Sequence, residues 1–275
     1  MESSGSILCY GSICADLHIW LPGWPLPGSG VHALKSIWQA GGNAFNEARA
    51  LAAWQARPQL YGDRLGFDPA GDLVATALHA LDLAAHIERD PAVVTPVCHI
   101  LITPDGERAI IALREGTAAS PPSQAALAAS SIVSVSRYGL HTAEVALAAR
   151  QLNRLVVAGD VSDPAEPLAQ AADVIVTSAA LLGSDPLARA RTLQGARGAP
   201  VFLTDSSRPA RVLVNNTWHE CMPPAQAVTD TTGAGDVFRA GVVYGLWKGW
   251  DWSEILAFAV QAATAQLAAS ARQSS

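Results

Sequence analysis

The sequence has few charged residues and almost no lysine. Charged side chains make up 15% of the 275 residues, the lysines are Lys35 and Lys248 alone, and the formal net charge is −6. A protein that binds the nucleic-acid backbone needs a surplus of positive side chains. The composition therefore argues against nucleic acid as the main partner, whereas the 50% hydrophobic content indicates a well-packed globular chain.

Other signatures are missing as well. The four cysteines are scattered, with no Cys-x-x-Cys pair and no zinc-ligand spacing, so we expect reduced thiols. The first residues lack the basic and apolar segments of a signal peptide, and no apolar run approaches the ~18 residues that cross a bilayer. We therefore expect a cytoplasmic protein with no membrane partner. A P-loop sequence is also absent, which argues against P-loop enzymes.

Short apolar runs alternate with amphipathic segments along the chain. The expected strands are 7–10, 132–135, 155–158, 173–176 and 201–204, and the expected helices are 46–56, 69–83, 142–152 and 253–269. This alternation predicts an α/β fold with a mostly parallel sheet covered by helices on both faces. No repeat or linker divides the chain, so we expect one domain over residues 1–275.

Two further regions read as extended chain. Residues 97–102 and 108–113 flank a Pro-Asp-Gly turn and predict a β-hairpin, and residues 17–21 and 31–38 flank a turn-rich connection. Three tryptophans lie here, Trp20, Trp24 and Trp38. They either lie exposed on a small sheet or fill a core, and the sequence leaves both readings open.

The most informative segment is Asp230-Thr231-Thr232-Gly233-Ala234-Gly235-Asp236, which precedes an apolar helix. Small residues at 233–235 let backbone N–H groups approach a ligand, and successive N–H groups at a helix start favour negative charge. The carboxylate of Asp236, in the first helical turn, has the position of a general base. Phosphoryl transfer to a hydroxyl group fits both features, although an ordinary capped helix start would also explain the glycines.

A second segment, Gly41-Gly42-Asn43-Ala44-Phe45-Asn46, opens an earlier helix. Together the two segments resemble the paired signatures of the PfkB family of carbohydrate kinases, the ribokinase-like sugar kinases. Residues 66–71 and the turn at 104–108 resemble the same family, and the resemblance runs from about residue 7 to 268. It implies a three-layer ribokinase-like fold with a small β-sheet lid at about 17–38 and 97–113, through which such proteins often dimerise.

The resemblance also implies roles for individual residues. Asp236 would be the catalytic base, and the amides of Gly233, Ala234, Gly235 and Asp236 would form the anion hole. The sugar would be bound by Asp16, Gly41, Gly42, Asn43 and Asn46, although Asn46 could be only a helix cap. Arg137, after the strand 132–135, would suit an anionic substituent of the substrate, or it is a surface arginine.

ATP and Mg²⁺ are the implied cofactors, with Thr177, Thr204, Ser206 and Thr232 on the nucleotide side and no metal ligand identified. Several family features are absent here. The expected Asn-x-x-Glu reads Thr-Ser-Ala-Ala at 177–180, the turn after Thr204 has no glycine, and the last helix lacks an asparagine near Val260. These changes affect the nucleotide and metal side rather than the base.

The sequence therefore predicts an ATP-dependent kinase that phosphorylates a hydroxymethyl group of a sugar or sugar derivative. Two alternatives stay open: a nucleoside kinase, and a catalytically impaired relative that only binds a sugar or nucleotide.

Overall fold

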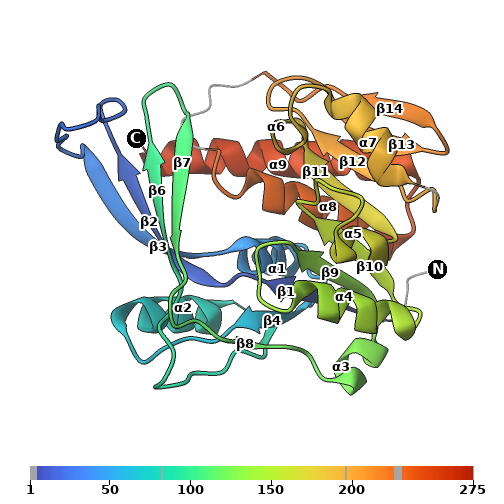
Figure 1. Cartoon of the computed structure of the whole chain (residues 1–275), viewed down its shortest axis with the longest axis horizontal. Helices are drawn as coiled ribbons and strands as arrows, with labels where there is room; N and C mark the ends of the chain where they lie inside the picture. Colours follow the sequence, from blue (N-terminus) through green and yellow to red (C-terminus); the bar gives the residue numbers. More distant parts are fainter. Residues whose placement is uncertain (1–4, 82, 196, 226–230, 275) are drawn as a thin grey trace.

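The computed structural model describes residues 5–81, 83–195, 197–225 and 231–274, which form two β-sheets and a set of helices (Figure 1). The strands of the main sheet are β1 Ser6–Gly11, β4 Gln59–Asp63, β5 Ala84–Ala85, β8 Ala119–Ser120, β9 Ser130–Ser136, β10 Leu155–Gly159, β11 Val174–Ser178, β12 Val201–Thr204, β13 Ala210–Val214 and β14 Thr217–Cys221. Their order is β14-β13-β12-β11-β10-β9-β1-β4-β5, with β8 paired to β4. All pairs from β12 to β5 are parallel, which confirms the expected fold class.

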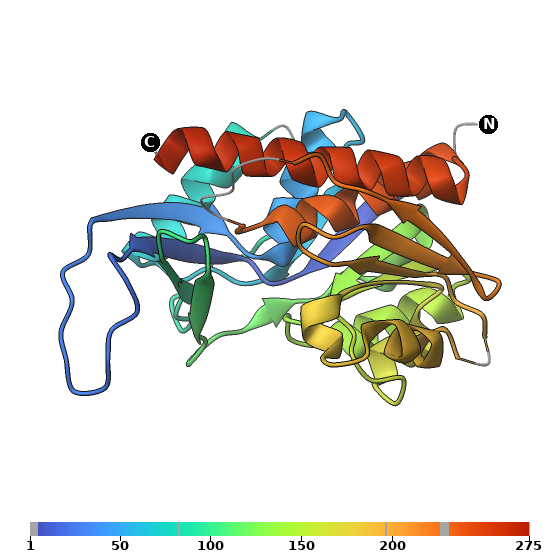
Figure 2. The same ribbon diagram turned by 90° about the horizontal axis from the view of Figure 1, so that it is seen from above.

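Helices cover both faces of this sheet, giving three layers (Figure 2). One face carries α1 Asn43–Ala53, α2 Pro69–Ala80, α8 Ala234–Lys248 and α9 Trp252–Ser274; the other carries α3 Gln124–Ala129, α4 Thr142–Gln151, α5 Pro167–Ala171, α6 Ala179–Leu182 and α7 Pro186–Gln194. Strand β1 shows why both faces are apolar. Ile7 and Cys9 pack into one core, and Leu8 and Tyr10 into the other. Because successive side chains of a strand point to opposite faces, a strand buried on both faces carries apolar residues at consecutive positions.

Local sequence determines where the helices begin. The Asp68 side chain accepts a hydrogen bond of 2.7 Å from Gly71 N and caps α2, as the Asp-Pro pair predicts. At α9 the Asp251 carboxylate accepts from the backbone of Glu254, whose own carboxylate accepts from Asp251 N, forming a reciprocal capping box. Helix α2 ends at Ala80, three residues earlier than the periodicity suggests.

A smaller sheet lies at one end of the main sheet in both views (Figures 1 and 2). Its strands are β2 Cys14–Trp20, β3 Lys35–Gly41, β6 Val97–Ile102 and β7 Arg108–Leu113, in the order β3-β2-β6-β7. The predicted hairpin is therefore confirmed as β6 and β7, which pair antiparallel. The segment expected to extend from residue 31 becomes a strand only at Lys35, because residues 22–34 form an exposed loop.

The edge strand β7 of the smaller sheet exposes apolar side chains on both of its faces. Every residue of β7 is exposed, including Ile110, Ile111 and Leu113. Trp24 is 45% and Trp38 48% exposed, so these two tryptophans do not fill a core. An exposed, apolar edge strand is a ready template for pairing with another chain.

Candidate active site

The expected anion cradle lies at the start of α8. Gly233 has φ 75° and caps the helix, Ala234 is its first residue, and Asp236 stands in its first turn. Asp230 lies outside the described residues. Gly235 has no positive φ, and a Cβ placed on it would meet no atom of the described residues within 4 Å, its own helical turn apart. Neither the backbone conformation nor packing against the described residues therefore requires glycine at 235.

The two signature segments are in direct contact, although they are far apart in the sequence. Asn46 Nδ2 donates a hydrogen bond of 2.9 Å to Asp236 Oδ2, which joins α1 to α8. Arg49, one turn further along α1, donates from Nη2 to Asn46 Oδ1 at 3.3 Å. These two bonds fix which end of the Asn46 amide faces the carboxylate. Asn46 lies in the body of α1, whose N-cap is Gly42, so it is not the cap of this helix.

Backbone geometry explains the glycine pair before α1. Gly42 has φ 96°, and a Cβ there would collide with the carbonyl oxygen of Ser12. At Gly41 a Cβ would overlap the carboxylate of Asp16, which reaches across from β2. Asp16 itself is buried. Gly41 therefore makes room for Asp16 beside the start of α1, and Gly42 supplies the positive φ that lets the chain pass close to Ser12.

Arg239 ties three acidic side chains together, and Asp236 is one of them. Its guanidinium lies 2.9 Å from Glu47 Oε2, 3.3 Å from Asp160 Oδ2 and 3.6 Å from Asp236 Oδ1, and its Nη2 also donates to Asn43 O at 3.4 Å. The Arg239 and Glu47 side chains are only 2% and 1% exposed. A Cβ on Gly159 would collide with this guanidinium, so glycine at the end of β10 makes room for it.

The environment of Asp236 shifts its ionisation. Burial raises the pKa of Asp236 to about 6, against the opposing effects of Arg239 and of the hydrogen bond from Asn46. The neighbouring carboxylates of Asp160 and Glu47 raise it further. Burial also raises the pKa of Asp160, again opposed by Arg239. A carboxylate whose pKa lies this close to neutrality can both accept and release a proton.

Three other candidate residues lie at or near the carboxyl ends of parallel strands of the main sheet. Arg137 comes after β9, Thr177 lies in β11, and Thr204 ends β12, so they share the carboxyl edge of the sheet, where open α/β sheets bind ligands. Thr177 is buried and donates to Val161 O at 2.8 Å. Ser206 follows in a turn with φ 51°.

The side chain of Arg137 is 41% exposed and is held by residues from the loop after β10. It donates to Ser162 Oγ at 3.0 Å and lies 3.7 Å from Glu166 Oε1. Among the remaining candidates, Asn43 is the first residue of α1, and Thr232 is half-buried beside Gly233.

Sequence reasoning missed Arg239, Glu47 and Arg49. Arg239 carried a signal, because a charged residue inside the apolar run of α8 must be paired if it is buried. Glu47, next to Asn46, carried the same signal, because it too is a charged residue that must be paired if it is buried. Nothing in the sequence indicates that these two residues, which are 192 positions apart, are partners.

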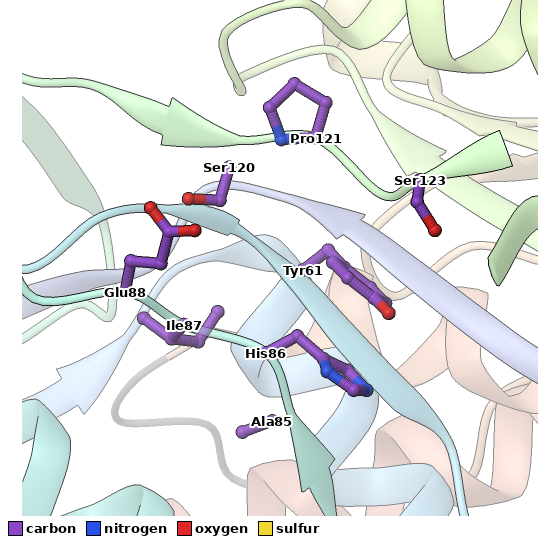
Figure 3. A pocket seen from close by; sticks show the side chains of 8 residues that line it. All are labelled: Tyr61, Ala85, His86, Ile87, Glu88, Ser120, Pro121 and Ser123. Atoms are coloured by element: carbon purple, nitrogen blue, oxygen red, sulfur yellow. The ribbon is translucent and has the colours of Figure 1, made fainter. Parts of the chain in front are cut away.

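A separate cavity of about 440 Å³ lies at another edge of the main sheet, near β4, β5 and β8 (Figure 3). Its lining residues are Tyr61, Ala85, His86, Ile87, Glu88, Ser120, Pro121 and Ser123. The rings of Tyr61 and His86 stack with centroids 4.4 Å apart. None of the candidate site residues lines this cavity, and we assign the chemistry to the convergent charged groups around Asp236 instead.

Comparison with known proteins gives a consistent picture. The family described as pfkB family carbohydrate kinase matches residues 4–275. Acarbose 7(IV)-phosphotransferase from Actinoplanes sp. is 28% identical over 269 residues, covering 89% of this chain and 86% of that protein.

Solved structures show the same fold. Arabidopsis thaliana ribokinase, complexed with ribose and ATP, matches with a TM-score of 0.78 at 22% identity. The match covers 97% of this chain and 93% of the ribokinase chain. Adenosine kinase from Sinorhizobium meliloti matches with a TM-score of 0.81 at 19% identity, and the match covers 99% of this chain and 100% of the adenosine kinase chain. No helix in the described residues combines the length and apolarity needed to cross a membrane.

Proposed function

The chain belongs to the pfkB family of carbohydrate kinases, and we propose that it transfers the γ-phosphoryl group of ATP to a hydroxymethyl group of a sugar or sugar derivative. The observation that carries this proposal is the placement of Asp236. It stands in the first turn of α8, it is only 15% exposed, and Asn46 and Arg239 hold its two oxygens in place.

Asp236 acts as the general base. Its carboxylate takes the proton of the accepting hydroxyl as that oxygen attacks the γ-phosphorus, while the bond to the β-phosphate oxygen breaks and ADP leaves. Arg239 keeps the carboxylate ionised at neutral pH, because its positive charge opposes the effect of burial on the pKa. Asn46 orients the carboxylate, and Arg49 in turn orients Asn46.

The amides of residues 233–236 stabilise the charge on the transferring phosphoryl group. Gly235 supports this role, because glycine there serves no conformational need and no packing need toward the described residues, and it leaves open space for a ligand. Backbone N–H groups at a helix start are oriented before the reaction and cost no reorganisation during it.

Asp16, Gly41, Gly42, Asn43 and Asn46 bind the sugar hydroxyls. The carboxylate of Asp16 and the start of α1 adjoin each other, and Asn46 links this side to Asp236. Arg137 would contact an anionic substituent of the substrate, since a guanidinium binds oxyanions with two parallel bonds. If so, Arg137→Ala weakens an anionic sugar far more than a neutral one, and equal weakening of both would refute this role.

Mg²⁺ would accompany the nucleotide and offset the charge of its phosphates. Residues 177–180 do not fit a direct ligand set, because Mg²⁺ prefers carboxylate oxygens and this segment has none. The hydroxyls of Thr177 and Ser178 are engaged with Val161 O and Leu181 N, respectively. Thr204, Ser206, Thr177 and Thr232 are proposed to adjoin the nucleotide without carrying the metal.

An ADP-release assay across ketoses, aldoses, anionic sugars and nucleosides tests the proposal, with Asp236→Asn as the matched variant. We expect a sugar to give activity that the variant loses almost completely, while its sugar affinity stays within about tenfold. Wild-type activity in the variant would remove Asp236 from the mechanism. A nucleoside as best substrate would favour the nucleoside-kinase alternative. Absence of ATP binding by calorimetry, with sugar present, would favour the impaired relative.

A further inference from the structure

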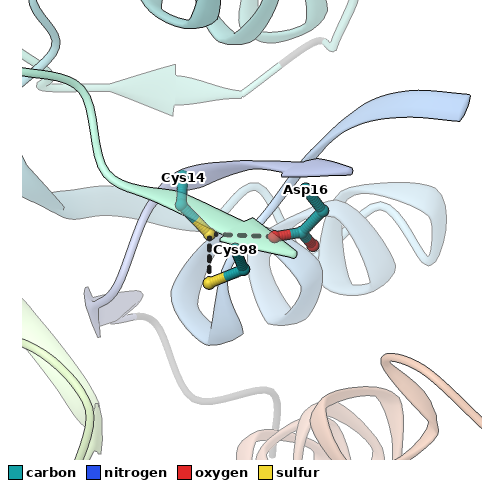
Figure 4. Close-up of side chains that lie close together, drawn as sticks. All are labelled: Cys14, Asp16 and Cys98. Atoms are coloured by element: carbon teal, nitrogen blue, oxygen red, sulfur yellow. Dashed lines mark hydrogen bonds between the residues drawn. The ribbon is translucent and has the colours of Figure 1, made fainter. Parts of the chain in front are cut away.

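Two thiols and a carboxylate meet on the smaller sheet. Cys14 and Asp16 are two residues apart on β2 and share one face, and Cys98 is paired with Asp16 on the adjacent strand β6. Cys14 Sγ lies 3.1 Å from Asp16 Oδ1 and 3.8 Å from Cys98 Sγ (Figure 4). The two cysteines are 84 positions apart, so the sequence spacing concealed this cluster.

We propose that Cys14, Asp16 and Cys98 form a binding site for a thiophilic divalent cation such as Zn²⁺, and that the bound cation inhibits the kinase by occupying the carboxylate of Asp16. The inhibitory part rests on the proposed function, in which Asp16 binds the sugar. The binding part stands on the geometry alone.

The separations of the donor atoms match a tetrahedral cation. With Zn–S bonds of about 2.3 Å, two thiolates of one tetrahedral site lie about 3.8 Å apart, and the two sulfur atoms here are 3.8 Å apart. The corresponding sulfur–oxygen separation is about 3.6 Å, so the present 3.1 Å would open slightly when the cation replaces the S–H···O hydrogen bond. All three donor atoms lie within 4.8 Å of one another.

The donor set selects the class of cation. Two thiolates favour Zn²⁺ or Cd²⁺, whereas Mg²⁺ prefers oxygen ligands, so the site would not compete for the nucleotide's metal. Three protein ligands leave a fourth position for water. Cys14 and Asp16 are buried while Cys98 is partly exposed, so the cation would reach the site from the side of Cys98. Binding breaks both S–H bonds, forms two metal–sulfur bonds and releases two protons to the solvent.

Co²⁺ serves as a spectroscopic probe of the site. Titrating the reduced protein with Co²⁺ in a thiol-free reducing buffer should produce the near-ultraviolet absorption of cobalt–thiolate bonds at one equivalent, and Zn²⁺ should abolish it. Cys98→Ser should weaken Co²⁺ binding by at least about tenfold. Cys221→Ser is the matched control, because Cys221 is a free and similarly half-buried thiol on β14. No absorption in the wild type, or an unchanged signal in Cys98→Ser, would overturn the site.

A second measurement does not depend on how the variants fold. Cadmium-113 NMR of the wild-type protein reports the number of sulfur ligands, and we expect two. A shift typical of oxygen ligands alone would count against the site.

Inhibition is tested with the sugar that gives the highest ADP release. Zn²⁺ should raise its KM in the wild type and not in Cys98→Ser, while the KM for ATP stays unchanged in both. A bound cation that leaves the sugar KM unchanged overturns the inhibitory part. Cobalt binding by a protein that phosphorylates no sugar would instead refute the proposed function and leave the metal site standing.

Discussion

Asn46 and Asp236 are 190 positions apart in the sequence, yet the side-chain amide of Asn46 donates a hydrogen bond of 2.9 Å to the carboxylate of Asp236. The bond joins α1, which follows the Gly-Gly pair, to α8, which begins within the Gly-Ala-Gly segment. Because the side chain of Asp236 also meets the buried Arg239, the proposed base is held from two helices at once. Its chemistry and its energetics can therefore both be tested at this one residue.

The pH dependence of turnover should report the ionisation of Asp236. Since a base must be deprotonated, kcat/KM should fall about tenfold per pH unit below the pKa of about 6 and reach a plateau above it. Initial rates in overlapping buffers give the profile, and circular dichroism checks that the protein stays folded. A flat profile down to pH values well below 6 would contradict the assignment.

Asp236→Asn should unfold at a higher temperature than the wild type at neutral pH. The pKa of Asp236 is raised from 3.8 to about 6, so its ionised form destabilises the folded state. Each unit corresponds to about 1.4 kcal/mol, which limits the gain to about 3 kcal/mol. This difference in stability should be complete above pH 6, shrink as the pH falls and disappear below 3.8, where the folded and the unfolded state both bind the proton. Thermal unfolding of the wild type and the variant across this pH range tests the prediction. A variant that is less stable than the wild type at neutral pH would show that the ionised carboxylate stabilises the fold.

Gly235→Ala should lower kcat without lowering stability. The new methyl group would meet no atom of neighbouring elements within 4 Å in the part of the chain that the structure describes, but it would occupy the space proposed for the phosphoryl group. Loss of one such donor contact lowers kcat by about a hundredfold or more, whereas the free energy of unfolding should change by less than about 0.5 kcal/mol.

Gly241→Ala provides the contrast for this experiment. A Cβ on Gly241 would lie 2.7 Å from the Cα of Ala259, so this variant should be destabilised by the contact between α8 and α9. If both variants lose stability and activity together, the phosphoryl site at Gly235 is not supported.

Glu47→Gln should destabilise the protein severely. It removes one partner of a buried ion pair and leaves Arg239 without its nearest carboxylate, at a cost of about 3–5 kcal/mol. Glu220→Gln is the control, because Glu220 pairs with Arg211 at the same kind of distance, 2.7 Å, but is 52% exposed. Removing that pair should cost no more than about 1 kcal/mol. Urea unfolding of both variants measures the free energy of unfolding. Equal losses of stability in the two variants would show that the buried pair contributes no more than the exposed pair.

The exposed apolar edge of the smaller sheet predicts a homodimer. Ile111→Lys on β7 should shift the protein towards the monomer, because a charged side chain on an edge strand opposes pairing. Leu187→Lys on α7 is a control, since Leu187 is also exposed but belongs to a different face. Light scattering after size exclusion measures the mass, and a wild-type protein that stays monomeric at high concentration would contradict this prediction.

Most of the fold could be predicted from the sequence because its signals are local. The run 201–204 and the hairpin strands 97–102 and 108–113 are confirmed to the residue, since apolar runs bounded by turn residues leave little freedom. The segment from residue 31 is wrong by four residues, because a loop rich in proline and glycine gives no signal for where pairing resumes.

The candidate site divides in the same way. The glycines before α1 and α8 and the carboxylate in the first turn of α8 could be recognised in the sequence, because the backbone conformation of a helix start depends on nearby residues. The partnership of Arg239 with Glu47 and the meeting of Cys14 with Cys98 are not, because long-range contacts depend on how the strands and helices are ordered in space.

Arg239 has one more consequence, for motion. A single guanidinium joins α1, the end of β10 and α8, so sliding any of these elements would separate buried opposite charges. We therefore expect this half of the protein to behave as a rigid platform when substrates arrive. We expect any closure around the substrates to involve the smaller sheet instead.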